Sequence, residues 1–242
     1  MVRFAAYSPD GRLVATASQD RTIRLWDSAS GRELRKLAGH SNMVRALAFS
    51  PDGRSLLSSS WDRTLKLWEV PGGVLKFTLQ GHGDLVKGAV YSPDGRWIAS
   101  AGGPDLTVRL WESSSGRELR VLKGASASVE AVLFTPSGGE LLASGHDGIL
   151  RVWDPATGRE LRRRTIHAGP VEALALSADG RRLASGGWDR IIRLWDWPGA
   201  GDLGIVGQHA GHVLGLAFTP DGKRLASAGH DGTVRLWDVP AP

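Results

Sequence analysis

A tryptophan followed by an acidic residue recurs along the whole chain at an almost constant interval. The six tryptophans of this pattern are Trp26, Trp68, Trp111, Trp153, Trp195 and Trp237. The intervals between them are 42, 43, 42, 42 and 42 residues. A fixed period of this length is typical of repeat architectures, in which each repeat buries its apolar face against its neighbours. The period therefore constrains the fold of all 242 residues.

Each repeat is composed of strand and turn signals. The tryptophans close strand-like runs such as TIRLWD and TLKLWE, and a turn such as SPDG precedes each run. In these turns proline presets φ, aspartate accepts local hydrogen bonds and glycine takes the left-handed conformation. An alternating run such as VRALAFS precedes the turn and predicts another strand, and a later run such as ELRKL predicts a fourth. The pattern requires no helix.

Four antiparallel strands in each repeat of about 42 residues predict a β-propeller. The Trp-Asp ends, together with Gly39-His40 and Gly81-His82, resemble the WD-repeat family, and the resemblance covers the entire chain. The implied fold class is all-β, with six four-stranded antiparallel blades in a single domain over residues 1–242. The expected repeats are approximately 2–40, 41–82, 83–125, 126–167, 168–209 and 210–242.

The last blade is predicted to lack its outer strand. The first strand begins at Val2, and the chain ends just after the third strand of the sixth repeat, which gives 23 strands rather than 24. The final run TVRLWD would then be an edge with unpaired backbone groups, which invites pairing with another chain. We expect either a fragment of a larger propeller or a unit that is completed by a second chain.

Composition narrows the possible functions only in part. The 30 basic residues are interleaved with 25 acidic ones, so the net charge of +5 predicts a solvated mixed surface and makes nucleic acid an unexpected partner. The absence of cysteine excludes disulfides and thiolate metal sites. The N-terminal residues lack the apolar run of a signal peptide or membrane span, which predicts a soluble, cytoplasmic protein without a membrane association.

Serine, histidine, aspartate and tryptophan recur at matched positions in four repeats. A catalytic triad is a single constellation, so this repetition favours a structural role, and no catalytic residue or cofactor is expected. The resemblance implies a hydrogen-bonded network of these residues inside each blade. The four sets are His40, Ser58, Asp62 and Trp68; His82, Ser100, Asp105 and Trp111; His167, Ser185, Asp189 and Trp195; and His209, Ser227, Asp231 and Trp237.

Two repeats depart from this pattern. The fourth has Ala125 in the histidine position and Ala143 in the serine position, and the first has no histidine at all. We expect these two blades to have the weakest protection against backbone hydrogen exchange. A basic residue also lies two positions before each tryptophan, and we expect it to pack on a neighbouring aromatic ring.

Functional positions should differ between repeats where scaffold positions agree. The resemblance implies partner contacts on the narrow face of the propeller, from the residue before the loop aspartate and from the residues that flank the first valine of the inner strand. The expected contact residues in the loops are Trp61, His146, Trp188 and His230. Those beside the valine are Arg3, Arg45, Lys87, Glu130, Glu172, Met43 and His212.

These residues predict a protein-interaction scaffold rather than an enzyme. Exposed aromatic residues on rigid loops are typical interface anchors, and the basic and acidic positions suit a peptide or protein that carries both charge signs. No metal site is predicted, because His146, His212 and His230 come from repeats four and six, with Trp188 between them. The alternative function is self-assembly through the open edge of the last blade, which gives a homo-oligomer.

Overall fold

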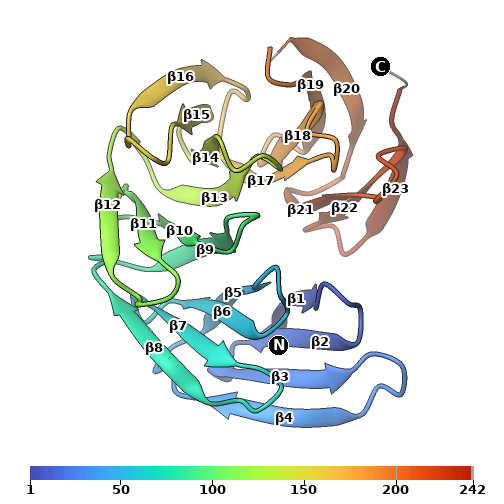
Figure 1. The fold of residues 1–242 in the computed structure, drawn as a ribbon. Coiled ribbons are helices and arrows are strands. Elements are labelled where there is room, and N and C mark those ends of the chain that lie inside the picture. Colours follow the sequence, from blue (N-terminus) through green and yellow to red (C-terminus); the bar gives the residue numbers. More distant parts are fainter. Residues whose placement is uncertain (200, 241–242) are drawn as a thin grey trace. The chain divides into compact units, whose positions relative to one another are not determined.

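The computed structural model describes residues 1–199 and 201–240, and these form six antiparallel sheets (Figure 1). Five sheets have four strands and one has three. Within every sheet the strands lie side by side in chain order. The predicted fold class is therefore confirmed: the chain has the six blades of an all-β propeller, and the last blade lacks its outer strand.

The strand boundaries follow the repeat. Blades 1 to 3 contain β1 (Val2–Tyr7), β2 (Leu13–Ser18), β3 (Thr22–Asp27), β4 (Glu33–Ala38), β5 (Val44–Phe49), β6 (Ser55–Ser60), β7 (Thr64–Glu69), β8 (Leu75–Gln80), β9 (Val86–Tyr91), β10 (Trp97–Gly102), β11 (Val108–Glu112) and β12 (Glu118–Leu122). Blades 4 to 6 contain β13 (Val129–Phe134), β14 (Leu141–Gly145), β15 (Ile149–Trp153), β16 (Glu160–Thr165), β17 (Val171–Leu176), β18 (Arg182–Gly187), β19 (Ile191–Asp196), β20 (Asp202–Gln208), β21 (Val213–Phe218), β22 (Arg224–Gly229) and β23 (Val234–Asp238).

The chain divides into two compact units, Met1–Gly124 and Ala125–Pro242. The first contains blades 1 to 3 and the second blades 4 to 6. The division falls at the expected boundary between the third and fourth repeats. A single domain over residues 1–242 remains a prediction, and each unit is described below by itself.

The SPDG-type turns form as the sequence predicts. In blade 2 the Ser50 hydroxyl donates to Asp52 at 2.6 Å, and the amide of Arg54 donates to the same carboxylate oxygen at 3.0 Å. Gly53 has a φ of 69°, which a residue without Cβ adopts at no steric cost. These local bonds fix the hairpin between β5 and β6 before any packing is considered.

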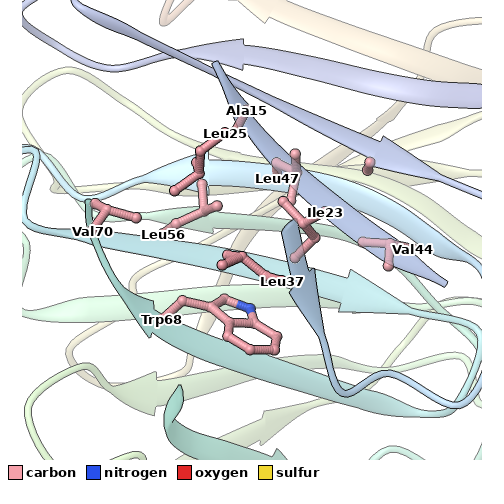
Figure 2. Packing of buried hydrophobic residues seen from close by; sticks show 10 residues of the cluster. Ala15, Ile23, Leu25, Leu37, Val44, Leu47, Leu56, Trp68 and Val70 are labelled. Atoms are coloured by element: carbon pink, nitrogen blue, oxygen red, sulfur yellow. The ribbon is translucent and has the colours of Figure 1, made fainter. Parts of the chain in front are cut away.

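The apolar cores lie between consecutive blades. In the first unit, Leu25 of β3 and Leu37 of β4 belong to one buried cluster with Leu56 and Trp68 of the next blade (Figure 2). In the second unit Trp195 of β19 packs in the same way with residues of blade 4. Each blade is a twisted sheet with two apolar faces, so it is stable only when neighbours cover both.

The last described strand is an edge. β23 pairs with β22 alone among the described strands, as the sequence predicts. Its side chains Val234 and Leu236 are 75% and 60% exposed, whereas the equivalent residues of inner blades are buried. No helix that could span a membrane occurs among the described residues.

Candidate functional site

Four blades contain the hydrogen-bonded network that the sequence predicts. The tryptophan Nε1–H donates to the serine hydroxyl at 2.8–2.9 Å, and the serine contacts the histidine Nε2 at 2.7–2.8 Å. The histidine Nδ1 lies 2.6–3.1 Å from the aspartate. Because the serine accepts from tryptophan, its own proton goes to Nε2, and the histidine donates through Nδ1. Each network links the loop residues His and Asp to the serine on the second strand and the tryptophan on the third strand of its blade.

In three of these networks the pKa of the aspartate, Asp62, Asp105 or Asp231, is lowered, which means that its anion is stabilised. Burial by itself would raise the pKa of Asp62, but hydrogen bonds from His40 and Thr64 outweigh it and hold that pKa well below its usual range. For Asp105, the hydrogen bond and charge of His82 overcome burial and lower the pKa to about 2. The serine and histidine side chains are buried, so the Ser/His/Asp groups are part of the blade interior rather than an exposed catalytic site.

Blade 4 has replaced its histidine with an arginine from another position. The guanidinium of Arg151 lies 2.8 Å from Asp147, and both side chains are buried. A cavity of about 10 Å³ lies beside them, and Ala125 and Ala143 line it where other blades have histidine and serine. The loop aspartate thus retains a charged partner, a compensation that the sequence analysis did not recognise.

In other blades the arginine two positions before the tryptophan also pairs with a carboxylate. Arg24 pairs with Glu33 at 2.7 Å, and Arg193 pairs with Asp202 at 3.3 Å on the outer strand of its blade. For these two arginines the polar contact is thus a carboxylate, and packing of the basic side chains on an aromatic ring stays a prediction. A carboxylate on the adjacent strand offers a charge-assisted hydrogen bond, which is stronger than a cation–π contact at a partly exposed site.

A β-bulge in the first strand of each blade presents one predicted contact residue in blades 1 to 5, and Leu214 in blade 6. The first strand of each blade skips one residue in its register with the second strand, between Val44 and Ala46 in blade 2 and at matching positions elsewhere. The bulged residues are Arg3, Arg45, Lys87, Glu130, Glu172 and Leu214. A bulge re-aims a side chain without ending the strand, so the variable residue leaves the sheet while its neighbours stay in the core.

In the second unit the structure brings the aromatic contact residues together. Trp188 stacks on His212 with ring centroids 4.8 Å apart and an interplanar angle of 14°. Its ring centroid also lies 5.2 Å from that of His146, with the two rings tilted at 55°. The ring centroid of His230 lies 5.9 Å from that of His212. The Trp188 Nε1–H donates to Glu172 at 2.9 Å. We call Trp188, His146, His212 and His230 the Trp188 cluster. Trp188 is held in place yet 43% exposed.

Two glutamates lie at the edge of the Trp188 cluster. The Nε2 of His146 is 3.2 Å from Glu130 and 3.8 Å from Glu172. Glu130 is buried, with its side chain only 2% exposed, so its carboxylate faces His146 rather than open solvent. The repeat positions of these three residues predict that they share one face, but not that they meet. The bulges in β13 and β17 bring them together.

In the first unit the predicted contact residues are less exposed. Trp61 is half-buried rather than projecting from its loop, and the ammonium of Lys87 lies 5.7 Å from the centre of its ring. Met43 is buried, and its carbonyl accepts a hydrogen bond from the Trp61 amide at 3.0 Å. Arg45 is half-buried and Arg3 exposed. The burial of Met43 corrects its assignment as a surface contact, because its side chain extends the apolar core instead.

Blades of four antiparallel strands with an internal Trp–Ser–His–Asp network define a WD-repeat propeller protein. Comparison with known families agrees: the WD40 family, described as "WD domain, G-beta repeat", matches six segments that together cover most of the chain. The matched segments are residues 2–27, 31–69, 73–112, 116–154, 158–196 and 203–238. The chain therefore belongs to the WD40 repeat family.

Similarity to individual curated proteins is confined to about one repeat. The chain is 55% identical over 40 residues to nuclear distribution protein PAC1 of Mycosarcoma maydis, which is 16% of this chain and 9% of that protein. It is 51% identical over 39 residues, again 16% and 9%, to the human dynein assembly factor with WD repeat domains 1. A probable serine/threonine-protein kinase, PkwA of Thermomonospora curvata, matches at 51% over 39 residues, which is 5% of its length.

Proposed function

We propose that this chain is a non-enzymatic scaffold that binds a protein or peptide. The contacts come from the loop between the second and third strands of each blade and from the start of each blade's first, innermost strand. The observation that supports this most directly is the Trp188 cluster. An exposed tryptophan that is already immobilised loses little conformational entropy on binding, and tryptophans of this kind are the commonest interface anchors. WD-repeat propellers typically serve as protein-interaction scaffolds, which agrees with this reading.

The charges beside Trp188 favour a partner with a basic group. Glu172 accepts a hydrogen bond from the indole Nε1–H of Trp188, and Glu130 lies on the adjacent blade beside His146. An arginine of the partner could contact the exposed part of Trp188 while its guanidinium approaches the carboxylate of Glu172. In the first unit, Lys87 beside Trp61 would suit an acidic residue of the partner. The expected partner is thus a protein or peptide that carries both charge signs.

The absence of a catalytic role is supported by how the reactive groups are used. The Ser, His and Asp side chains are engaged in four repeated networks inside the blades. Buried hydroxyls that already donate to histidine and accept from tryptophan are not available to a substrate. The names of the relatives refer to dynein assembly and nuclear distribution, but the matched segment is about one repeat and supports the scaffold class alone.

The test is a quantitative capture experiment. The wild-type chain and the variants Trp188→Ala, Trp61→Ala and Trp97→Ala are immobilised and compared for what they retain from a cell lysate. Trp97 is a matched control, because it is a half-buried tryptophan at the opposite end of its strand, beside Arg96. We expect Trp188→Ala to lose a partner that the control retains. Equal capture by all variants would contradict the proposal.

The exposed edge of β23 supports a second function, self-association. Val234 and Leu236 present apolar side chains on β23, which pairs on one side only among the described strands, and such an edge is a template for pairing with another chain. The molar mass in solution should then rise with concentration, and Val234→Lys should suppress the rise. A strictly monomeric wild-type chain at high concentration would exclude this function.

A further inference from the structure

Glu130, His146 and Glu172 form a compact group of metal-ligand types inside the second unit. The imidazole and the two carboxylates each offer a ligand atom, and these atoms all lie within 4.8 Å of one another. From this geometry we infer a binding site for a divalent transition-metal ion. One nitrogen and two oxygen ligands suit Zn²⁺ best, with Mn²⁺ as the second choice.

The spacing matches what one ion requires. Zinc takes nitrogen and carboxylate oxygen at about 2.0–2.2 Å, so neighbouring ligands of a tetrahedral site lie roughly 3.4 Å apart. The Nε2 of His146 is 3.2 Å from one oxygen of Glu130 and 3.8 Å from one oxygen of Glu172. An ion placed between them needs only small movements of the side chains. Three protein ligands leave a further position for water or an external ligand.

A simple ion pair explains the geometry less well. In the four blade networks, histidine approaches its aspartate at 2.6–3.1 Å with hydrogen-bond geometry. The Nε2 of His146 is also buried, yet it makes no hydrogen bond to any described residue despite its nearness to Glu130. A donor nitrogen would be expected to point at one carboxylate. A buried nitrogen that lies close to two carboxylates without a hydrogen bond to either is instead available as a ligand to an ion between them.

Neighbouring side chains hold both carboxylates in position. Ser128 donates to Glu130 at 2.8 Å, and Trp188 donates to Glu172 at 2.9 Å. Outer hydrogen bonds of this kind orient metal ligands and are typical of protein metal sites. A carboxylate offers about four lone-pair sites, so these bonds and other contacts of either glutamate leave room for an ion. A divalent ion also supplies two positive charges beside the buried Glu130, where a protonated imidazole supplies one.

The experiment is a calorimetric titration of the full chain with Zn²⁺ after treatment with a chelator. We expect one ion per chain and a loss of affinity of at least about a hundredfold in each of His146→Gln, Glu172→Gln and Glu130→Gln, since even outer partners contribute 10–100-fold. Titration with Co²⁺ and measurement of its visible absorption reports whether nitrogen and oxygen ligate the ion. Loss of His146 should change this spectrum.

The matched control is a His212→Gln/His230→Gln double variant, which removes the neighbouring surface histidines and keeps the three proposed ligands. It should bind Zn²⁺ as the wild type does. The inference is overturned if the wild type shows no saturable binding, if the three ligand variants bind normally, or if the control loses binding. Should Glu130→Gln fail to fold, the half-buried His146 and Glu172 decide the result. The titration uses the chain alone, so its outcome is independent of the proposed partner surface.

Discussion

Replacing Ser58 with alanine should destabilise the first unit far more than replacing its neighbour Ser59. Both side chains lie on β6 and are 0% exposed, so both substitutions remove one oxygen from an equally buried position. The hydroxyl of Ser58 accepts from Trp68 Nε1 at 2.9 Å and contacts His40 Nε2 at 2.8 Å. The hydroxyl of Ser59 makes no hydrogen bond to any described residue. Packing is therefore matched, and only the network differs.

The expected difference follows from the groups that lose a partner. Ser58→Ala leaves the indole N–H of Trp68 and the Nε2 of His40 buried without a partner, at about 1–3 kcal/mol each. We expect a total loss of roughly 2–6 kcal/mol in the free energy of unfolding. Ser59→Ala removes a buried polar group that has no partner, so it should be neutral or stabilise by up to about 1 kcal/mol.

The assay should combine urea unfolding with native-state hydrogen exchange of peptides that cover β6 and β7. Exchange is needed because a chain with two compact units need not unfold in one step. Ser58→Thr serves as a conservative control, since Thr16 accepts the equivalent bond from Trp26 at 2.9 Å in blade 1. Equal destabilisation by Ser58→Ala and Ser59→Ala would refute the reasoning, because it would mean that the network contributes nothing beyond packing.

Two further predictions concern charged groups in the blades. The pKa of Asp105 is about 2 in the folded chain against 3.8 for the free side chain. Its ionised form therefore stabilises the fold above about pH 4, and this contribution is lost as pH falls towards 2. Over that range the unfolding free energy of the wild type should drop more steeply than that of Asp105→Asn. Arg151→Met should cost roughly 3–5 kcal/mol in the free energy of unfolding, because it leaves the buried carboxylate of Asp147 without its counter-charge. Arg24→Met breaks a half-exposed pair with Glu33 and should cost at most about 1 kcal/mol in the same denaturation assay. Similar costs would contradict the assignment of Arg151 as the replacement for histidine.

The compensation in blade 4 also bears on the predicted weakness of that blade. The missing histidines of blades 1 and 4 predict the fastest backbone hydrogen exchange in these two blades. Because Arg151 pairs with Asp147, the loop of blade 4 retains a charged anchor, and blade 1 should be the less protected of the two. Comparable exchange in both blades would indicate that the arginine does not replace the network.

The sequence by itself determined the elements of this protein, because their causes are local and repeated. The SPDG turns and the alternating runs each act within a few residues, and together with the period of the Trp-Asp pairs they predicted the blades and the short last blade. The four Trp–Ser–His–Asp networks were implied by the resemblance to the WD-repeat family. The loop residues were also identifiable, since positions such as Trp188 differ between repeats where Trp195 does not.

Only the tertiary structure decided what the variable residues do together. Whether Trp61 is covered by Lys87, whether Met43 enters the core, and whether Arg151 turns to Asp147 depend on side-chain directions that spacing does not specify. The meeting of His146 with Glu130 and Glu172 depends on bulges in two inner strands and on the packing of one blade against the next. A repeat encodes its own turns and strands, but contacts between repeats arise from the geometry of packing, which no single repeat contains.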